Sequence, residues 1–503
     1  MKYLRYSAIL MFAMIYSDAA SQNSQVMYYM NLPQNHFLNP AIKPSSRFYI
    51  GLPVITGVSE EIGNDFLKVS DIIPPGTIID STFFTKLDIN KLAANLKSRN
   101  TITTNTGIQL LGLGLTFGKD LYIFFDIIDR IDANLIFPRD LMKLYITGYD
   151  QFIGQTIDLS GMNIKGQYYR EYGLGFSRNI TDNLRIGAKV KLLSGIASMS
   201  MDNRALTLKV NNDFSQTVTA DASLDVSGKE TLDRIFKDNN IKVLSGDNLI
   251  SKVDSTRGYN FDGCLYDFLR VPVSNAGISF DIGAVYTIGK LISLSASIRD
   301  LGFINWKKDL KSYNARNSFT LKGITLEDVV NDTYSIDEMV NSLVDTVKKS
   351  FIEDPSPESY RTKLPTGIAV GAAINLLPVL SLGVLSDSRI YAGSIKESFT
   401  MSANLYLGRL FSASMSYTIA NYSYDNLGFG LAFRAGIAQI YLIADKIPLS
   451  WEKVYYGGEG GGNYSSIRIP QNMNLFNLNL GLNFSFGKPR ITSKTDKPMI
   501  LIQ

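Results

Sequence analysis

Apolar and polar residues alternate along several segments of the chain, most clearly in segment 476–486 near its C-terminus. Six apolar residues of this segment fall on one face, and the other face holds only Asn, Gly and Ser. A period of two predicts a β-strand. Its eleven residues match a tilted strand that crosses a bilayer, whereas soluble strands have about five or six residues. The same alternation recurs in segments 184–192, 278–288, 292–298 and 427–433.

The spacing of turns predicts how these strands connect. Tight links at 117–120, 179–183, 288–290, 375–378, 408–409 and 435–438 alternate with long links at 60–105, 132–166, 228–274, 306–363 and 450–471. Outer-membrane barrels have short turns on the periplasmic side and long loops outside. We therefore expect an all-β fold, a transmembrane antiparallel β-barrel of about 14 strands. Short helices are expected in its loops at 87–96 and 326–351. A closed barrel leaves no free strand edge and takes an even number of strands. Sixteen strands are possible if segment 204–226 crosses the membrane instead of forming an extended outer hairpin.

Two other architectures fit part of this pattern. A soluble exported β-sandwich also alternates, with its apolar face inward, and would make the protein a binding module. The long strands and the faces rich in Gly, Ser and Ala favour the barrel. The uncharged segment 364–386 is long enough for one membrane helix. Pro365, Pro378 and several Gly residues instead predict two short elements around a turn at 375–378.

The N-terminus has the layout of a secretory signal peptide. Lys2 and Arg5 precede an apolar stretch at 8–16, and small residues end at Ser21. We expect four parts: a signal peptide (1–21), a periplasmic N-terminal arm (22–45), an outer-membrane β-barrel (46–488) and a C-terminal tail (489–503). The expected location is the cell outer membrane. The expected partners are outer-membrane lipid and the barrel assembly machinery.

Composition excludes some functions. Charged residues make up 19% of the 503 residues, below the roughly 25% of an average soluble domain. The net charge of +4 is too mild to indicate a nucleic-acid partner. Cys264 is the single cysteine, so the chain forms no internal disulfide.

The chain offers little for catalysis. His36 is the only histidine, and a Ser-His-Asp site could use no other. Because His36 lies in the expected periplasmic arm, a structural role is favoured over a barrel-embedded hydrolase. One His and one Cys also leave no zinc ligand set. We expect no catalytic, cofactor-binding or metal-binding residues, so the protein is not expected to be an enzyme.

If the apolar face of each strand contacts lipid, the opposite face lines the lumen. Candidate lumen-facing residues carry both signs of charge, with an excess of positive charge: Arg185, Lys189, Lys191, Asp281, Arg299 and Arg434. A charged wall would hold water and could orient the anionic head of an amphiphile. The alternative is that these residues pair across a filled interior and leave no conduit.

Short motifs resemble a known group of barrels. Run 37–41 contains Asn39, Pro40 and Ala41, and run 300–306 contains Asp300, Gly302 and Trp306. Together with runs 184–195, 364–366, 441–445 and 477–488, they resemble one uncharacterised branch of the outer-membrane barrels related to the FadL and PorV/PorP types. The resemblance implies a FadL-like barrel that moves hydrophobic compounds or belongs to the type IX secretion and gliding apparatus. Its implied partners are hydrophobic small molecules or secretion-system proteins. Tail 489–503 departs from the family, whose barrels often end on the aromatic residue of the last strand; Phe486 would act from an internal position.

Overall fold

The computed structural model describes residues 26–52, 56–66, 68–79, 95–118, 120–147, 150–213, 215–228, 274–289, 291–321, 352–391, 394–408, 410–420, 423–448, 450–457, 464–471 and 475–487. Four expectations fall wholly or mainly outside these residues: the signal peptide, the two loop helices at 87–96 and 326–351, and the tail at 489–503.

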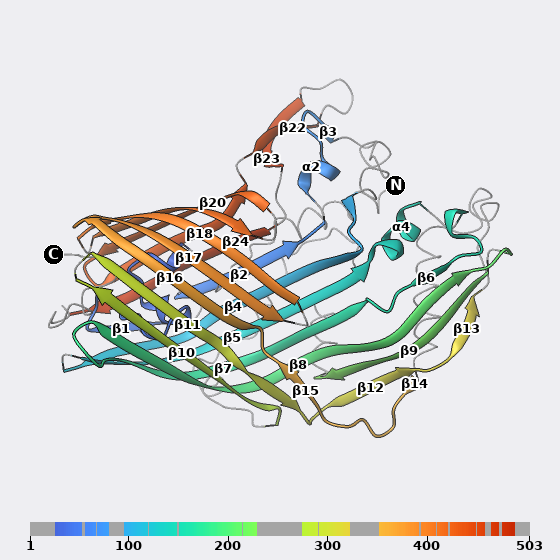
Figure 1. Cartoon of the computed structure of the whole chain (residues 1–503), viewed down its shortest axis with the longest axis horizontal. Helices are drawn as coiled ribbons and strands as arrows, with labels where there is room; N and C mark the ends of the chain where they lie inside the picture. The colour runs from blue at the N-terminus through green and yellow to red at the C-terminus, as the bar shows by residue number, and fades with distance from the viewer. Residues whose placement is uncertain are drawn as a thin grey trace, which may run out of the picture.

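The wall of the molecule is a closed antiparallel barrel of 14 strands (Figure 1). In wall order they are β1 (Phe48–Gly51) with β2 (Gly57–Asn64) as one interrupted strand, β4 (Arg99–Phe117), β5 (Leu121–Pro138), β7 (Asn163–Asn179), β8 (Leu184–Val210), β10 (Ala276–Ile288), β11 (Ile292–Trp306), β16 (Thr366–Leu377), β17 (Leu380–Tyr391), β18 (Ser394–Leu407), β19 (Phe411–Ala420), β20 (Ser423–Ala435), β21 (Ala438–Pro448) and β24 (Leu475–Phe486). The barrel closes where β24 pairs with β1, with Phe48 opposite Phe486, and with β2.

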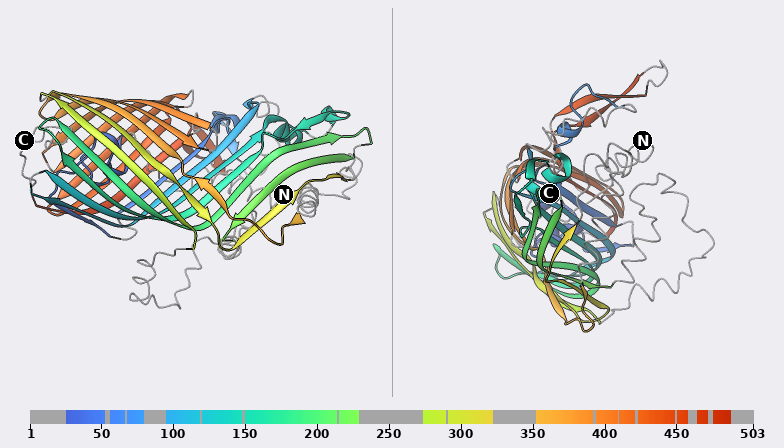
Figure 2. Two further views of the ribbon diagram at one scale, coloured as in Figure 1. Left: turned by 60° about the horizontal axis from the view of Figure 1, so that its bottom comes forward. Right: turned by 90° about the vertical axis from the view of Figure 1, so that its right-hand side faces the viewer.

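Several strands continue beyond the wall. β8 is 27 residues long, and its distal half pairs with β9 (Gln216–Ser227). β9 pairs in turn with β12 (Leu310–Ala315) and β13 (Ser318–Leu321). We call the distal half of β8 with β9, β12 and β13 the outer extension; it projects from one end of the barrel (Figures 1 and 2). Segment 204–226 therefore lies in an outer hairpin, and the count of fourteen strands rather than sixteen is confirmed.

Smaller elements complete the fold. They are β6 (Thr156–Asp158), β14 (Ile352–Glu353), β15 (Tyr360–Lys363), a separate sheet of β3 (Ile78–Ile79), β22 (Trp451–Gly457) and β23 (Tyr464–Pro470), the helices α2 (Val69–Ile72) and α4 (Arg139–Thr147), and the 3-10 turn η4 (Asp150–Phe152). Among the described residues, no helix has the length and apolar character to cross a membrane. Segment 364–386 forms β16 and most of β17 around a tight turn, as its prolines and glycines predicted.

The six tight links expected from the sequence lie at the end of the barrel opposite the outer extension, whereas the short connections β17–β18 and β19–β20 lie at the other end. Gly118 and Gly289 occupy two of the tight links with φ of 59° and 63°. A left-handed backbone of this kind is readily adopted by Gly, which has no Cβ. The glycines of the sequence therefore mark where the chain reverses.

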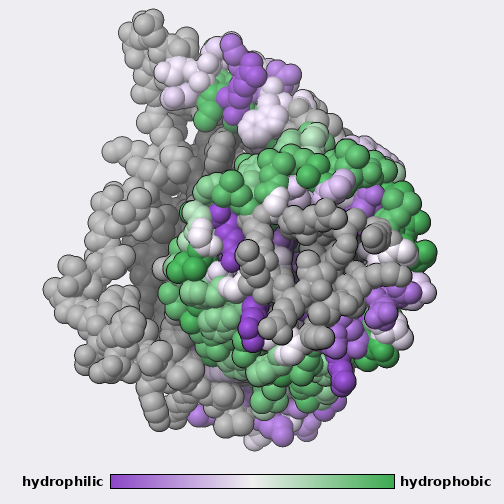
Figure 3. Space-filling view, turned by 90° about the vertical axis from the view of Figure 1, so that its left-hand side faces the viewer, coloured by the Kyte–Doolittle hydropathy of each residue, from purple (hydrophilic) through white to green (hydrophobic). Residues whose placement is uncertain are grey.

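The barrel wall is apolar outside and polar inside. Ile282 is 61% exposed, Val370 57% and Leu480 42%, whereas the neighbours Asp281 and Asn479 are each 1% exposed. Figure 3, which faces the end of the barrel with the tight links, shows hydrophobic residues around its outer surface. A soluble β-sandwich would bury its apolar face. The structure is therefore a transmembrane barrel, and the sandwich alternative is wrong.

Because the outer face contacts lipid, the cost of placing a charge on it should depend on how deep the position lies in the membrane. Leu480 lies midway along β24, and Arg on the lipid face near the bilayer midplane costs about 2 to 4 kcal/mol. We expect Leu480→Arg to reduce the folded fraction on heat-modifiable gels. The matched control is Leu410→Arg, because Leu410 is 56% exposed but lies in the tight link between β18 and β19, where the cost falls to about 0 to 1 kcal/mol. Equal effects of the two substitutions would contradict the assigned depth.

Candidate functional site: the barrel lumen

The described N-terminal segment lies inside the barrel. Residues 26–47, here called the plug, contain two short 3-10 turns, η1 (Met27–Tyr29) and η2 (Pro33–Phe37). Tyr28, His36 and Asn39 are at most 1% exposed. The expected periplasmic arm over 22–45 is therefore wrong for residues 26–45. The physical reason is that 22–42 contain no Asp, Glu, Lys or Arg, so their aromatic, apolar and amide side chains can be buried once hydrogen-bonded.

One side of the plug is aromatic. The Tyr29 hydroxyl lies 2.5 Å from the Val384 carbonyl oxygen, and the Tyr406 hydroxyl donates to the Tyr29 carbonyl oxygen at 2.5 Å. The Tyr28 hydroxyl donates to Ser295 Oγ at 2.9 Å. A Cβ added at Gly383 would come within 2.6 Å of the Tyr29 ring. This part of the wall is therefore shaped to hold Tyr29.

The motif Asn39-Pro40-Ala41 holds the other part of the plug against the barrel wall. Asn39 donates to the Tyr28 hydroxyl at 3.1 Å and accepts from the Ala41 backbone N–H at 2.9 Å. A Cβ at Gly187 would lie 2.3 Å from the Pro40 carbonyl, and a Cβ at Gly283 would lie 2.0 Å from Asn39 Oδ1. The motif and these two wall glycines therefore form one close contact between the plug and the wall.

His36 joins the plug to a carboxylate of the wall. Its Nε2 lies 2.7 Å from Asp126 Oδ2 on β5, and both side chains are fully buried. Asp126 also accepts from Gln109 Nε2 at 2.9 Å and lies 3.4 Å from Lys189 Nζ. His36 therefore lies at the interface between the plug and the wall. Among the described residues, no group of His, Cys, Asp and Glu could hold a metal ion.

The structure places five of the six candidate lumen-facing residues inside the barrel, and Lys189, Lys191 and Asp281 belong to one cluster. Arg185, Lys189, Lys191, Asp281 and Arg299 are 1 to 3% exposed. The sixth, Arg434, lies apart near the tight-link end and donates to the Ser485 carbonyl oxygen at 2.7 Å.

Each of the inner charges has a partner. Lys191 Nζ lies 2.7 Å from Asp281 and 2.6 Å from Asp300. Arg299 forms an ion pair with Asp387. The Arg185 guanidinium donates to Ser177 Oγ at 3.2 Å. The charged wall is a bonded network rather than a free electrostatic surface.

The main residue that sequence reasoning missed is Glu171 on β7. Its carboxylate lies 2.6 Å from Arg130 Nε, 2.8 Å from Lys189 Nζ and 3.9 Å from Lys191 Nζ. Three cations therefore converge on one fully buried acid. Alternation along 167–175 places Glu171 on the same strand face as Gly173 and Gly175. This pattern could have identified Glu171 as a lumen-facing residue.

A β-bulge explains why Asp300 joins this network. Asp300 has a φ of 57°, and the register between β10 and β11 shifts beside it. A bulge puts two residues opposite one and redirects a side chain. Arg299 is buried inside and Asp300 reaches Lys191, although they are consecutive.

Two contacts cross the lumen above the plug. Arg389 on β17 lies 3.1 Å from Asp132 on β5, and Lys396 on β18 donates to Thr103 on β4 at 3.0 Å. In the closed wall, β17 and β18 lie opposite β4 and β5. The cavity between them measures about 30 Å³, room for about two waters. Side chains from opposite sides of the wall therefore meet here, above the plug.

Fold and site together define a transmembrane β-barrel whose lumen holds its own N-terminal segment. Residues 40–445 match the model of the family of unknown function DUF5723, and the chain belongs to that family. No curated protein matches it.

Three solved structures are similar to this chain. The toluene transporter TodX of Pseudomonas putida is 10% identical, with 93% of this chain and 96% of that chain covered and a TM-score of 0.38. The toluene transporter TbuX of Ralstonia pickettii is 9% identical, with 94% and 100% covered and a TM-score of 0.40. A FadL homologue of Pseudomonas aeruginosa is 10% identical, with 93% and 97% covered and a TM-score of 0.41.

Proposed function

We propose that this protein is a non-enzymatic outer-membrane channel for small hydrophobic or amphiphilic compounds, gated by its plug. The observation that carries the proposal is the plug itself. About eight strands give a barrel that side chains can fill, whereas 16 to 18 strands leave an aqueous channel. A wall of 14 strands is wide enough to need an inserted segment to close it. Non-covalent contacts hold this segment, so it can be displaced.

The outer membrane is the proposed location because single-chain barrels of this kind have an even strand number and short periplasmic turns. The tight links would then face the periplasm and the outer extension would face the outside. Outer-membrane lipid and the barrel assembly machinery are the corresponding partners.

The lumen suits an amphiphile. Ion-paired residues from β5, β7, β8 and β10 form one part of its wall. An apolar cluster lies beside the plug and includes Leu385, Ala432 and Ile443 of the wall. An anionic head could replace a carboxylate in the network while an apolar tail contacts the cluster.

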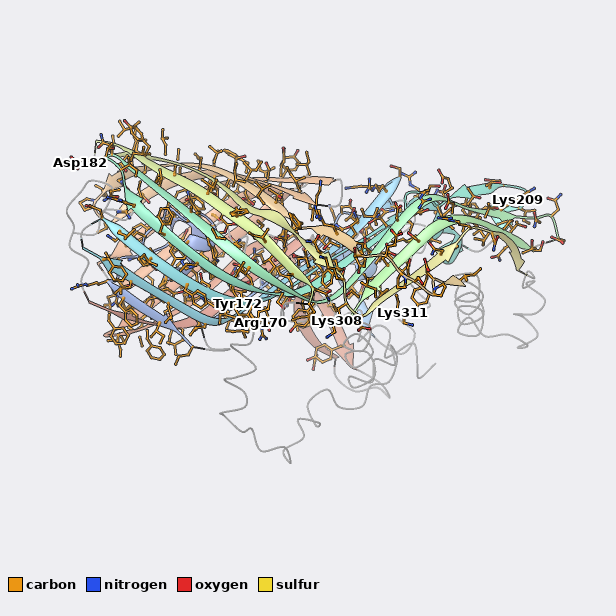
Figure 4. The ribbon with its side chains drawn as sticks, turned by 90° about the horizontal axis from the view of Figure 1, so that it is seen from below. Arg170, Tyr172, Asp182, Lys209, Lys308 and Lys311 are labelled. Atoms are coloured by element: carbon orange, nitrogen blue, oxygen red, sulfur yellow. The ribbon has the colours of Figure 1, made fainter. Side chains whose placement is uncertain are left out.

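Flux of a long-chain fatty acid into liposomes tests this function. We expect purified full-length protein to raise the flux above that of empty liposomes, because a fatty acid displaces the plug that closes the lumen to ions. Arg389→Gln with Lys396→Gln should raise it several-fold further, because these substitutions remove both cross-lumen contacts. The control is Lys209→Gln with Lys308→Gln, two lysines outside the barrel (Figure 4), which should leave the flux unchanged. Flux equal to that of empty liposomes for all three proteins would contradict a channel.

The outer extension favours a second candidate, an accessory role in type IX secretion or gliding. Its exposed face is polar: the side chains of Thr217 and Thr320, and those of Thr219 and Ser318, are hydrogen-bonded across neighbouring strands. A sheet that projects beyond the membrane could dock a secreted protein. A folded barrel without fatty-acid flux would favour this role.

A further inference from the structure

A large groove opens on the outer surface of the barrel. Its volume is about 1,100 Å³. It forms where the wall is irregular: β10 begins at Ala276, opposite Ser194, while β8 continues to Val210. β11 meanwhile changes partner from β16 to β15 beyond Arg299.

The floor of the groove is apolar and faces lipid. Phe280, Ile298, Leu301 and Ile390 line it, and each is at least 40% exposed. They belong to the outward faces of β10, β11 and β17. In a membrane, hydrocarbon must therefore fill this groove.

The described residues that line the groove include no carboxylate and two cations on the lipid face, Arg361 and Lys363, which pair with Asn305 and Phe303 of β11. Lys165 also lines it, but it pairs with Asn134 on the lumen face of the wall. Arg361 is held in place, since its guanidinium lies 4.1 Å from the centre of the Phe303 ring and its Nε donates to Asn305 Oδ1 at 2.8 Å. A fixed guanidinium is suited to bind an anionic group such as a phosphate.

The cations lie at the depth of lipid headgroups. Lys363 is fourteen residues from the tight-link end of β16 at Leu377. About nine to eleven tilted residues cross the hydrocarbon region. On β7, the outward face already carries an ion pair at Arg170, 2.6 Å from Asp129 (Figure 4). The cations thus lie beyond the apolar band, while the groove floor lies within it.

We infer that this groove binds one anionic lipid of the membrane, with its acyl chains on the apolar floor and its phosphate at Arg361 and Lys363. Charge complementarity selects this occupant, because a neutral hydrocarbon would not engage two cations. The site does not depend on the plug or on transport through the lumen, so it extends beyond the proposed function.

Native mass spectrometry of the full-length protein in detergent tests this inference. Phosphatidylglycerol and phosphatidylcholine with identical acyl chains are the probes. We expect one phosphatidylglycerol retained per barrel and much weaker retention of phosphatidylcholine. The double variant Arg361→Ala, Lys363→Ala should bind phosphatidylglycerol about 25-fold more weakly, since each cation near an anionic lipid contributes a factor of about five. Lys209→Ala, Lys308→Ala removes equal charge elsewhere and should change nothing.

A second pair of variants tests the floor without changing charge. Ile298→Trp should fill part of the groove and reduce retention of phosphatidylglycerol. Leu431→Trp, at a 51% exposed lipid-facing position of β20 outside the groove, should not. Equal retention of the two lipids by the unaltered protein would overturn the inference. Unchanged retention in both the double variant and Ile298→Trp would overturn it as well.

Discussion

Glu171→Gln is expected to destabilise the barrel by about 3 to 5 kcal/mol, the usual cost of removing one partner from a buried ion pair. The carboxylate is 0% exposed and lies within 2.8 Å of both Arg130 Nε and Lys189 Nζ. A neutral amide would leave two buried cations without their closest counter-charge. Lys191, 3.9 Å away, would lose attraction too, although Asp281 and Asp300 still pair with it.

Urea unfolding in lipid vesicles, followed by heat-modifiable gel migration, measures this loss. The control is Arg204→Gln in the outer extension. Arg204 is 54% exposed and lies 3.5 Å from Asp202 and 3.7 Å from Asp221, and exposed ion pairs contribute about 0 to 1 kcal/mol. A loss at Glu171 no greater than that at Arg204 would show that the lumen network is not a buried structural element.

The wall of the barrel could be predicted because alternation reports which face of a strand meets lipid. Leu480 and Asn479 are neighbours with opposite environments, 42% and 1% exposed. The tight links could be predicted for a similar reason, because turn residues determine the backbone conformation only over a few positions. Both signals depend only on residues that are close together in the sequence, so both predicted the structure correctly.

The plug could not be predicted in the same way. Tyr29 contacts Val384, 355 positions away, and no periodicity indicates such a partner. The absence of charge over 22–42 was visible, but it fits a loose arm as well as a buried segment. Only the closed wall shows that a space exists for this segment to fill.

The charges of the lumen were only partly accessible to sequence reasoning. Period two indicates that Lys189 and Lys191 share a face, but it does not identify Glu171 as their common neighbour. It also fails at Asp300, because the bulge changes the register there. Pairing partners depend on register, which sequence alternation alone leaves open.

Removal of the plug has the other large expected effect. Deleting residues 26–45 takes away the contacts of Tyr28, Tyr29, His36 and Asn39 with the wall. The wall itself remains closed, because β1 begins at Phe48 and pairs with β24. Of the two constrictions, only the cross-lumen contacts at Arg389 and Lys396 would remain, and these side chains can move. We therefore expect the deletion to convert a closed barrel into a pore.

Conductance across planar lipid bilayers tests this account most directly. The full-length protein should be silent, and the 26–45 deletion should give steady ion conductance. A control deletion of 205–220 shortens the tip of the outer extension and leaves Arg204 and Asp221 as a two-residue turn; it should be silent as well. A folded 26–45 deletion that stays silent, or a full-length protein that conducts equally, would contradict the claim that the plug closes the lumen.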